Sequence, residues 1–300
     1  MENFYYGAHM SIKNGIISAI DEIIEYEGNF IQVFLSNPIG VKSNIKLTDN
    51  ECLKIRSKLV DSDCLIVIHL PYVINLSKPR LNLIDTWWIK MICHQLLISH
   101  KIGSIGCVVH VGKHLDLTIE EGIENMYNSL VYIIDYIIVN KLDTFIILET
   151  AAGQGTELIT TKNNSLEDLA TFYNKFTHLQ KKHLKLCVDT CHIYAAGFDI
   201  TNQNMVQRFF DDFNRLIGIK HIALIHLNDS KACCGSCVDR HENIGYGKIG
   251  IEGLRNFIRY GAFYKIPIIL ETPTQFIKEI QLIKTVKKGV NKWAKKFNLN

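Results

Sequence analysis

Hydrophobic residues gather in eight short runs along the chain, most of them rich in β-branched side chains. The runs are apolar throughout instead of alternating with polar residues, which is typical of strands covered on both faces. Stretches with helical periodicity separate them, for example 85–100 and 117–140. The predicted strands are 4–8, 30–35, 64–69, 105–110, 144–149, 184–189, 221–226 and 266–271.

Alternating strands and helices of this number predict an α/β fold, a closed (β/α)8 TIM barrel. The chain has 300 residues, 5 prolines and no stretch resembling a linker, so we predict one domain over 1–300. Ser165 and Asp168 predict a capping-box start for the helix that follows. A basic C-terminal segment, about 284–300, is interpreted as a solvated helix face, with a phosphate-attracting patch as the alternative.

Composition limits the class of protein. The hydrophobic content of 47% and the net charge of +3 fit a globular chain that does not require a nucleic-acid partner. The N-terminus lacks the pattern of a signal peptide, and the apolar run 130–139 is too short to span a membrane, so we expect an intracellular protein. Nine scattered cysteines also favour a reducing compartment. We expect free thiols in the CCxxC cluster, although local disulfide pairing stays open; its residues are Cys233, Cys234 and Cys237.

Six of the predicted strands end on residue types that bind metals. One histidine at a strand end is usually a hydrogen-bonded core residue. In a parallel barrel, however, all strand C-termini lie on one face, so six such side chains would converge on one pocket. They are His69, His110, Glu149, Asp189, His226 and Glu271.

Three further candidates follow strand ends: His192, Asp239 and His241. Asn228 and Asp229 either orient the ring of His226 or shape the turn. The nine candidates comprise four carboxylates and five imidazoles, and converging carboxylates resist joint ionisation unless cations neutralise them. Zinc prefers about four nitrogen and oxygen donors, so about three zinc ions sharing one carboxylate account for the set. Manganese or iron at one position stays open.

Several long motifs resemble the endonuclease IV family of apurinic/apyrimidinic endonucleases. They are GAHMS at Gly7, LETAAGQGTE at Leu148, CVDTCHIYAAGFD at Cys187, HLNDSK at His226, VDRHENIGYGKIG at Val238 and ILETP at Ile269. The resemblance implies a monomeric, zinc-dependent DNA-repair enzyme. It would hydrolyse the phosphodiester 5′ to an abasic site in duplex DNA, leave a 3′-hydroxyl, and in some members also trim 3′ ends.

The resemblance also implies how the nine donors are divided among three zinc ions. Glu149 would bridge two of the ions, and either Glu149 or Glu271 would orient the attacking water. In the family pattern the first ion is held by His69, His110 and Glu149, the second by Glu149, Asp189, His226 and Glu271, and the third by His192, Asp239 and His241.

Matches at the expected DNA contacts are looser. Tyr72 stands where the family inserts a side chain into the duplex, and Val73 follows it. Ile39 replaces an arginine wedge, although apolar side chains also unstack bases. The remaining candidates for phosphate contacts are His9, for which a core role is the alternative, His114 and Arg240.

Two rival functions use the same barrel. Metal-dependent sugar isomerases and epimerases have carboxylate-rich sites for one or two metals, whereas this chain supplies many imidazoles. A non-catalytic DNA-binding descendant of such an enzyme need not keep all nine donors. Both features favour the nuclease.

Overall fold

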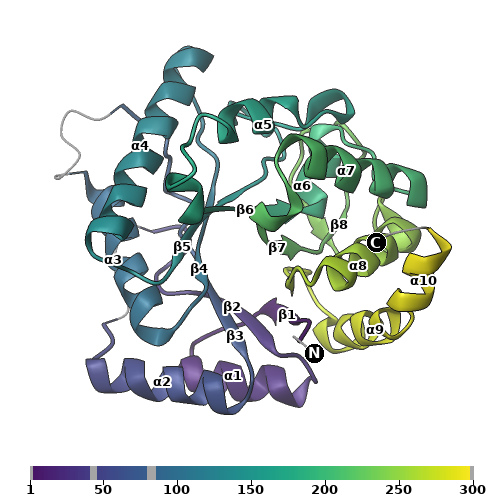
Figure 1. The fold of residues 1–300 in the computed structure, drawn as a ribbon, viewed down its shortest axis with the longest axis horizontal. Helices are drawn as coiled ribbons and strands as arrows, with labels where there is room; N and C mark the ends of the chain where they lie inside the picture. Colours follow the sequence, from purple (N-terminus) through teal and green to yellow (C-terminus); the bar gives the residue numbers. More distant parts are fainter. Residues whose placement is uncertain (1–2, 41–45, 80–85, 298–300) are drawn as a thin grey trace.

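The computed structural model describes residues 3–40, 46–79 and 86–297. Eight parallel strands close into a barrel in the order β1-β10-β7-β6-β5-β4-β3-β2, and helices surround it (Figure 1). The prediction of a single (β/α)8 barrel is therefore confirmed. The barrel strands are β1 (Tyr6–His9), β2 (Phe30–Phe34), β3 (Leu65–His69), β4 (Gly106–His110), β5 (Phe145–Glu149), β6 (Leu184–Asp189), β7 (Ile222–His226) and β10 (Ile268–Leu270).

The helices follow the strands in sequence, as expected for strand–helix units. Two short strands, β8 (Asp229–Ser230) and β9 (His241–Glu242), pair antiparallel outside the barrel. The α-helices are α1 (Ile16–Glu25), α2 (Asp49–Asp61), α3 (Trp87–Ile102), α4 (Ile119–Val139), α5 (Glu167–Tyr173), α6 (Thr190–Ala196), α7 (Gln203–Leu216), α8 (Gly250–Tyr264), α9 (Phe276–Lys288) and α10 (Val290–Lys296).

The predicted capping box before α5 is wrong. Ser165 Oγ accepts a hydrogen bond from the backbone N–H of Glu167, only two residues on, and the helix begins after Leu166. A serine hydroxyl can form such a local turn in place of a helix cap. Reciprocal capping boxes occur instead at the start of α2, with Thr48, and of α4, with Thr118.

The barrel interior is layered because successive side chains of a strand point to opposite faces. One apolar residue from each of seven strands forms a cluster inside the barrel: Phe30, Val67, Val108, Ile147, Cys187, Leu224 and Ile269. Two positions later, on the same face, each strand or its end carries a polar residue. The apolar layer thus forms a floor beneath a polar layer at the C-terminal rim.

The basic C-terminal segment is helical as far as the structure describes it. In α10, Trp293 is buried and its ring lies 4.9 Å from that of Tyr260 on α8, while Lys292, Lys295 and Lys296 are exposed. The lysines therefore occupy the outer face of an amphipathic helix. Within the described residues, none of the helices combines the length and apolar content that crossing a membrane requires.

Candidate metal centre

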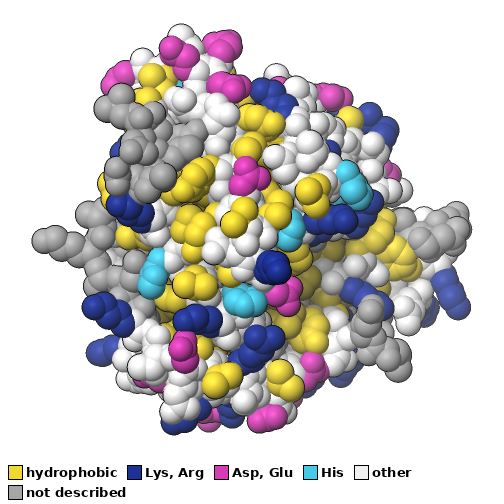
Figure 2. Space-filling model, turned by 60° about the vertical axis from the view of Figure 1, so that its left-hand side comes forward, with side chains coloured by type: hydrophobic (Ala, Val, Ile, Leu, Met, Phe, Trp, Pro, Cys, Tyr) yellow, Lys and Arg dark blue, Asp and Glu magenta, His cyan; other side chains and the backbone are white. Residues whose placement is uncertain are grey.

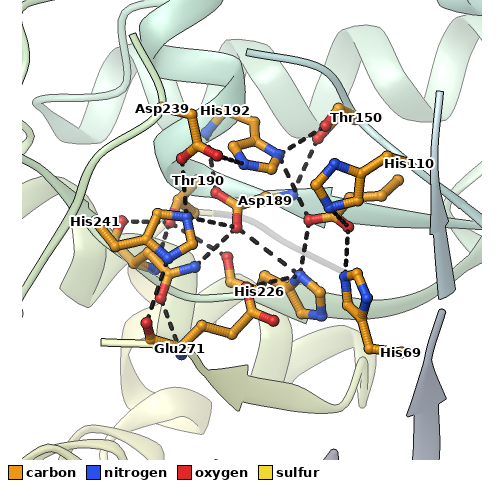
Figure 3. Close-up of polar contacts among 12 residues, drawn as sticks. His69, His110, Thr150, Asp189, Thr190, His192, His226, Asp239, His241 and Glu271 are labelled. Atoms are coloured by element: carbon orange, nitrogen blue, oxygen red, sulfur yellow. Dashed lines mark hydrogen bonds and ion pairs between the residues drawn. The ribbon is translucent and has the colours of Figure 1, made fainter. Parts of the chain in front are cut away.

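The polar layer at the barrel rim is a cluster of imidazoles and carboxylates (Figure 3). All six predicted strand-end residues lie in it, and three more join them: His192 from α6, Asp239 from a loop and His241 from β9. The convergence predicted from the strand ends is therefore present in the fold. Most of these side chains are buried or half-buried.

Glu149 lies at the middle of the cluster and is almost fully buried. Its Oε2 is 3.3 Å from His69 Nε2 and 3.2 Å from His110 Nε2. Its Oε1 is 2.9 Å from His226 Nδ1 and 3.4 Å from His192 Nδ1. Each carboxylate oxygen thus faces a different set of rings, as a bridging ligand would.

Asp189 and Asp239 connect the remaining rings. Asp239 lies between two of them, 3.2 Å from His192 Nε2 and 3.2 Å from His241 Nε2. Asp189 Oδ1 caps α6 by accepting from the backbone N–H of His192, while Asp189 Oδ2 is 3.8 Å from His226 Nδ1. Asp189 therefore both starts a helix and faces the cluster.

Backbone carbonyls fix the orientation of several rings. His69 Nδ1 lies 2.7 Å from the carbonyl oxygen of Leu70, and His192 Nδ1 lies 2.9 Å from that of Thr150. A neutral ring that donates from Nδ1 keeps a lone pair on Nε2. His69 Nε2 then faces Glu149 and His192 Nε2 faces Asp239, and a histidine whose other ring nitrogen is held by a carbonyl in this way has the arrangement of a metal ligand.

The donor atoms fall into groups whose members all lie within 4.8 Å of one another. Three of these groups match the division expected from the family, including the double membership of Glu149. His241 Nε2 is buried and makes no hydrogen bond of good geometry within the described residues, although Asp239 Oδ1 lies 3.2 Å away. Nitrogen and carboxylate donors crowded in this way suit zinc.

Mutual attraction shapes the ionisation of the metal-free cluster. Burial disfavours a charged Glu149, but the neighbouring His110 and His226 outweigh it and hold the pKa of the carboxyl well below its usual range. Burial likewise opposes a charge on His241, yet Asp189 and Asp239 raise its pKa to about 9. Glu149 is therefore held in its ionised form, which is the form that binds a cation.

Sequence reasoning missed several polar residues of the cluster. Gln32 is fully buried on β2, and Thr150 Oγ1 accepts from the backbone N–H of Asp189. Two buried thiols, Cys187 and Cys191, also lie within 4.8 Å of ligand atoms. Gln32 was not predicted because it lies in mid-strand and not at a strand end. Its position two residues after the inward-facing Phe30 is the feature that indicates an inward-facing side chain.

Asn228 and Asp229 have separate tasks. Asn228 Nδ2 donates to Asp189 Oδ2 at 2.7 Å, so it orients that carboxylate and not the His226 ring. Asp229 accepts hydrogen bonds from five backbone N–H groups, three of them in the loop before α8 and one at the first residue of that helix, and so shapes the turn that leads into α8. These donors are Ser230, Gly245, Gly247, Ile249 and Gly250.

The predicted DNA contacts differ in position. The half-exposed ring of Tyr72 lies 5.4 Å from that of His69 and 5.3 Å from that of His110. The backbone N–H of Tyr72 donates a hydrogen bond to the carbonyl oxygen of Pro38. This bond tethers the loop of the exposed Ile39 to the Tyr72 loop.

The other candidates for DNA contacts also occupy distinct places. His9 contacts the cluster through Gln32, with 3.0 Å between His9 Nδ1 and Gln32 Nε2. The ring of His114 and the guanidinium of Arg240 instead hydrogen bond to local carbonyl oxygens, those of Leu117 and Asp239. Val73 lines the cavity beside the cluster.

A cavity of about 390 Å³ opens beside the cluster. Besides the donors His110, His192, Asp239, His241 and Glu271, its lining includes Tyr72, Lys78, Lys113, Gln154 and Glu157. Lys113 Nζ lies 3.2 Å from Glu157 Oε1, so part of this positive charge is paired. On the face drawn in Figure 2, lysine and arginine side chains are scattered among acidic and hydrophobic ones.

The cysteines of the CCxxC segment are free thiols, as the sequence predicts. All nine cysteines are free, including the exposed Cys233 and Cys234 and the half-buried Cys237. The CCxxC segment precedes the donor Asp239, but none of its sulfur atoms belongs to a group of donors close enough to hold a metal within the described chain.

Comparison with known proteins identifies the family. Residues 20–295 match the family model described as "Xylose isomerase-like TIM barrel". A protein of Thermosipho africanus named "Probable endonuclease 4" is 35% identical over 89% of this chain and 92% of its own length. The "Endonuclease 4 homolog" of Dictyostelium discoideum is 32% identical over 94% of this chain and 51% of its own length.

Solved structures agree in fold. The endonuclease IV of Thermus thermophilus superposes with a TM-score of 0.73 at 26% identity, covering 97% of this chain and 99% of that one. A D-tagatose 3-epimerase-like protein has a TM-score of 0.68 at 18% identity over 97% and 99% of the two chains, which shows the shared barrel alone. With a barrel of this kind and relatives of this similarity, the chain belongs to the endonuclease IV family of xylose isomerase-like TIM barrels.

Proposed function

We propose that the protein is a zinc-dependent DNA-repair endonuclease that hydrolyses the phosphodiester 5′ to abasic sites in duplex DNA and leaves a 3′-hydroxyl. The observation that carries the proposal is the set of nine donors in three groups, two of which share Glu149. Relatives named endonuclease 4 support the nuclease reading over the sugar epimerases, whose likeness is limited to the fold.

The proposed ligands are those named from the sequence, with Glu149 shared between two ions. Bound zinc supplies a Lewis acid that stabilises negative charge on phosphoryl oxygens and lowers the pKa of water. The protein holds the donors in advance: Leu70 and Thr150 fix two rings, and Asn228 fixes Asp189. Glu149 and Glu271 are the carboxylates that would orient the attacking water.

Selectivity for abasic DNA follows from the depth of the cluster. A phosphodiester reaches buried donors only if the nucleotide leaves the helical stack, and an abasic nucleotide has no base pairing or stacking to lose. The saving is on the order of a few kcal/mol. Tyr72, with Val73 beside it, and Ile39 would occupy the opened duplex from two tethered loops.

Phosphate contacts are proposed for five basic or imidazole side chains. Lysine or arginine side chains and backbone amides commonly position DNA through its phosphates. The proposed contacts are His9, His114 and Arg240, together with Lys78 and Lys113 from the cavity lining. Trimming of 3′ ends would use the same cluster, because it breaks the same kind of bond.

An incision assay tests the proposal. The zinc-loaded protein is incubated with a duplex that carries a single tetrahydrofuran abasic analogue, beside an undamaged duplex of equal sequence. We expect one cut at the 5′ side of the analogue, a 3′ end that a DNA polymerase extends, and about three bound zinc ions per chain.

Variants make the test specific to the cluster. Glu271→Gln and His226→Ala should lose incision, whereas Glu120→Gln on the exposed face of α4 should keep it. A protein that binds zinc fully and leaves the abasic duplex intact would contradict the proposed activity. A 3′ blocking group in place of the internal lesion shows whether trimming accompanies incision.

A further inference from the structure

Gln32 lies in the middle of β2 and has no solvent exposure. Its amide touches three side chains of the polar layer. Oε1 is 2.8 Å from His226 Nε2, while Nε2 is 2.5 Å from Glu271 Oε1 and 3.0 Å from His9 Nδ1. Both hydrogens of the NH2 group and the carbonyl oxygen thus have partners, and a buried polar side chain that is bonded in this way makes its surroundings rigid.

The chemistry of the neighbours fixes which way the amide points. An ionised carboxylate only accepts hydrogen bonds, so the NH2 group of Gln32 must face Glu271. The second hydrogen of that group points to His9 Nδ1. Gln32 Oε1 is thereby turned toward His226 Nε2, and because an amide oxygen only accepts, that nitrogen must carry a hydrogen.

A hydrogen on Nε2 leaves neutral His226 with a lone pair on Nδ1. That atom lies among three carboxylates: it is 2.9 Å from Glu149 Oε1, 3.3 Å from Glu271 Oε2 and 3.8 Å from Asp189 Oδ2. The nitrogen that Gln32 leaves unprotonated is therefore the one placed to share a cation with these acids. The other oxygen of Glu271 is the one held by Gln32.

We propose that Gln32 is a positioning residue of the metal centre. It fixes the tautomer of His226 and the orientation of Glu271, two of the four donors that form one group with Glu149 and Asp189. Gln32 acts through these donors and touches neither ion nor substrate. The inference rests on the proposed function in one respect, namely that this group of donors holds an ion.

Mutation can test this positioning role of Gln32, because a side chain and not the main chain makes the contacts. His69 and His192 are oriented by main-chain carbonyls, which no substitution removes. Partners that hold the second nitrogen of a metal-binding histidine contribute roughly 10–100-fold to metal affinity. Loss of the Gln32 amide should therefore lower the affinity for one ion and leave the affinity for the others unchanged.

Gln32→Leu removes the hydrogen bonds while keeping a side chain of similar volume. Zinc affinity is measured by titration against a competing chelator, on the full chain. We expect one of the zinc ions to bind about 10–100-fold more weakly than in the wild type, and the others to be unchanged. The matched control is Gln95→Leu, which replaces a buried glutamine of α3 that donates to Ser36.

A second readout separates positioning from a general effect on folding. In the zinc-loaded protein with 15N-labelled histidine, nitrogen chemical shifts report which ring atom carries the hydrogen. We expect His226 to be protonated at Nε2 in the wild type and in Gln95→Leu, and to lose this single form in Gln32→Leu. If Gln32→Leu does not fold without metal, Gln32→Met supplies the same test with a more adaptable side chain.

The possible results are distinct. Unchanged zinc affinities together with an unchanged His226 tautomer in Gln32→Leu would overturn the role assigned to Gln32 while leaving the proposed nuclease intact. A wild-type protein that binds no zinc at this group would overturn the metal centre, and the role of Gln32 with it. A uniform loss of all ions would show that Gln32 supports the fold instead.

Discussion

At the scale of single residues, Glu149 has the most connections in the cluster. Glu149→Gln exchanges one acceptor oxygen for an amide NH2 that faces imidazole nitrogens 2.9–3.4 Å away. Because this carboxylate belongs to two donor groups, we expect more than one zinc ion to be lost. Incision should fall by at least about a thousandfold, equivalent to several kcal/mol of lost charge stabilisation.

Zinc content by mass spectrometry and single-turnover incision measure these effects. Glu120→Gln, on the exposed face of α4, is the matched control. Retention of every ion by Glu149→Gln would show that this carboxylate is no bridge.

A second residue-scale prediction concerns His221, far from the cluster. Burial, followed by the charges of Lys185 and Lys220, lowers the pKa of His221 to about 4, and its Nδ1 lies 2.9 Å from the hydroxyl of Tyr173. A histidine in an unfolded chain has a pKa near 6.5. Between about pH 6.5 and 4, His221 therefore binds a proton in the unfolded chain but not in the folded chain. Folding stability from this group is therefore complete above pH 6.5 and falls as the pH drops toward 4.

Urea unfolding of the metal-free protein at pH 7.5 and pH 5 tests the prediction. We expect the wild type to lose more stability between these pH values than His221→Gln does. His94→Gln, at an exposed histidine of α3 that does not influence the pKa of His221, should behave as the wild type. Equal losses in wild type and His221→Gln would contradict the assignment.

Individual donors were predictable from the sequence because each ends a strand or follows one closely. Gln32 was not, since it lies inside an apolar run where a polar residue is usually a solvent-facing position. Its role depends on the alternation of side chains across β2 and on the closeness of His226 and Glu271, which only the closed barrel provides.

At the scale of elements, the packing of α8 depends on a glycine. A methyl group at Gly253 would lie 2.1 Å from the carbonyl oxygen of Ile200. Gly253→Ala gains about 1 kcal/mol in helix propensity, but the overlap costs roughly 1–3 kcal/mol or more, because the obstacle is backbone. We expect a net loss of stability, measured by thermal and urea unfolding.

The control for this change is Gly289→Ala, at the end of α9. The added methyl group would lie 3.8 Å from the carbonyl oxygen of Val286, an ordinary van der Waals distance, and the φ of −94° at Gly289 suits any residue. Gly289→Ala should be neutral or slightly stabilising. Equal stability of the two variants would show that α8 can shift away from Ile200.

Element boundaries were predicted unevenly. The strands were found to within about two residues because continuous apolar runs end abruptly on polar donors. The start of α5 was misplaced because Ser165 has two local bonding partners to choose from, and the sequence does not decide between them. The hairpin of β8 and β9 was also missed, since strands of two residues leave no hydrophobic pattern.

At the scale of the whole molecule, bound ions should add to stability. The four carboxylates and five imidazoles come together only in the folded barrel, so an ion that they hold binds the folded state in preference to the unfolded chain. A ligand that binds only the folded state at 100 times its Kd stabilises it by about 2.7 kcal/mol per site. We expect a higher Tm with zinc than with a chelator.

Magnesium is the control ion for this prediction, because it prefers oxygen ligands and binds imidazoles poorly. Melting curves with zinc, magnesium and chelator should therefore place magnesium with the chelator. A Tm indifferent to zinc would contradict a folded-state metal centre.

The global fold was predictable because eight apolar runs separated by helices have few ways to pack, and a chain of this length suits one barrel. The geometry that places nitrogen and oxygen atoms within 4.8 Å of one another was not. It depends on the stagger of neighbouring strands and on loops such as the one that Asp229 organises. These arise from tertiary contacts and leave little trace in local sequence.

The pairing of β1 with β10 also orders events during translation. Gly7 on β1 lies opposite Ile269 on β10, the last strand of the barrel, and Glu271 directly follows β10. The ribosome synthesises the amino-terminal strands first, so the barrel cannot close until its last strand has been made. Eight of the nine donors precede that strand, and the ninth, Glu271, follows it. A chain released before β10 would therefore lack both the closed barrel and Glu271, and under the proposed function it would not cut DNA.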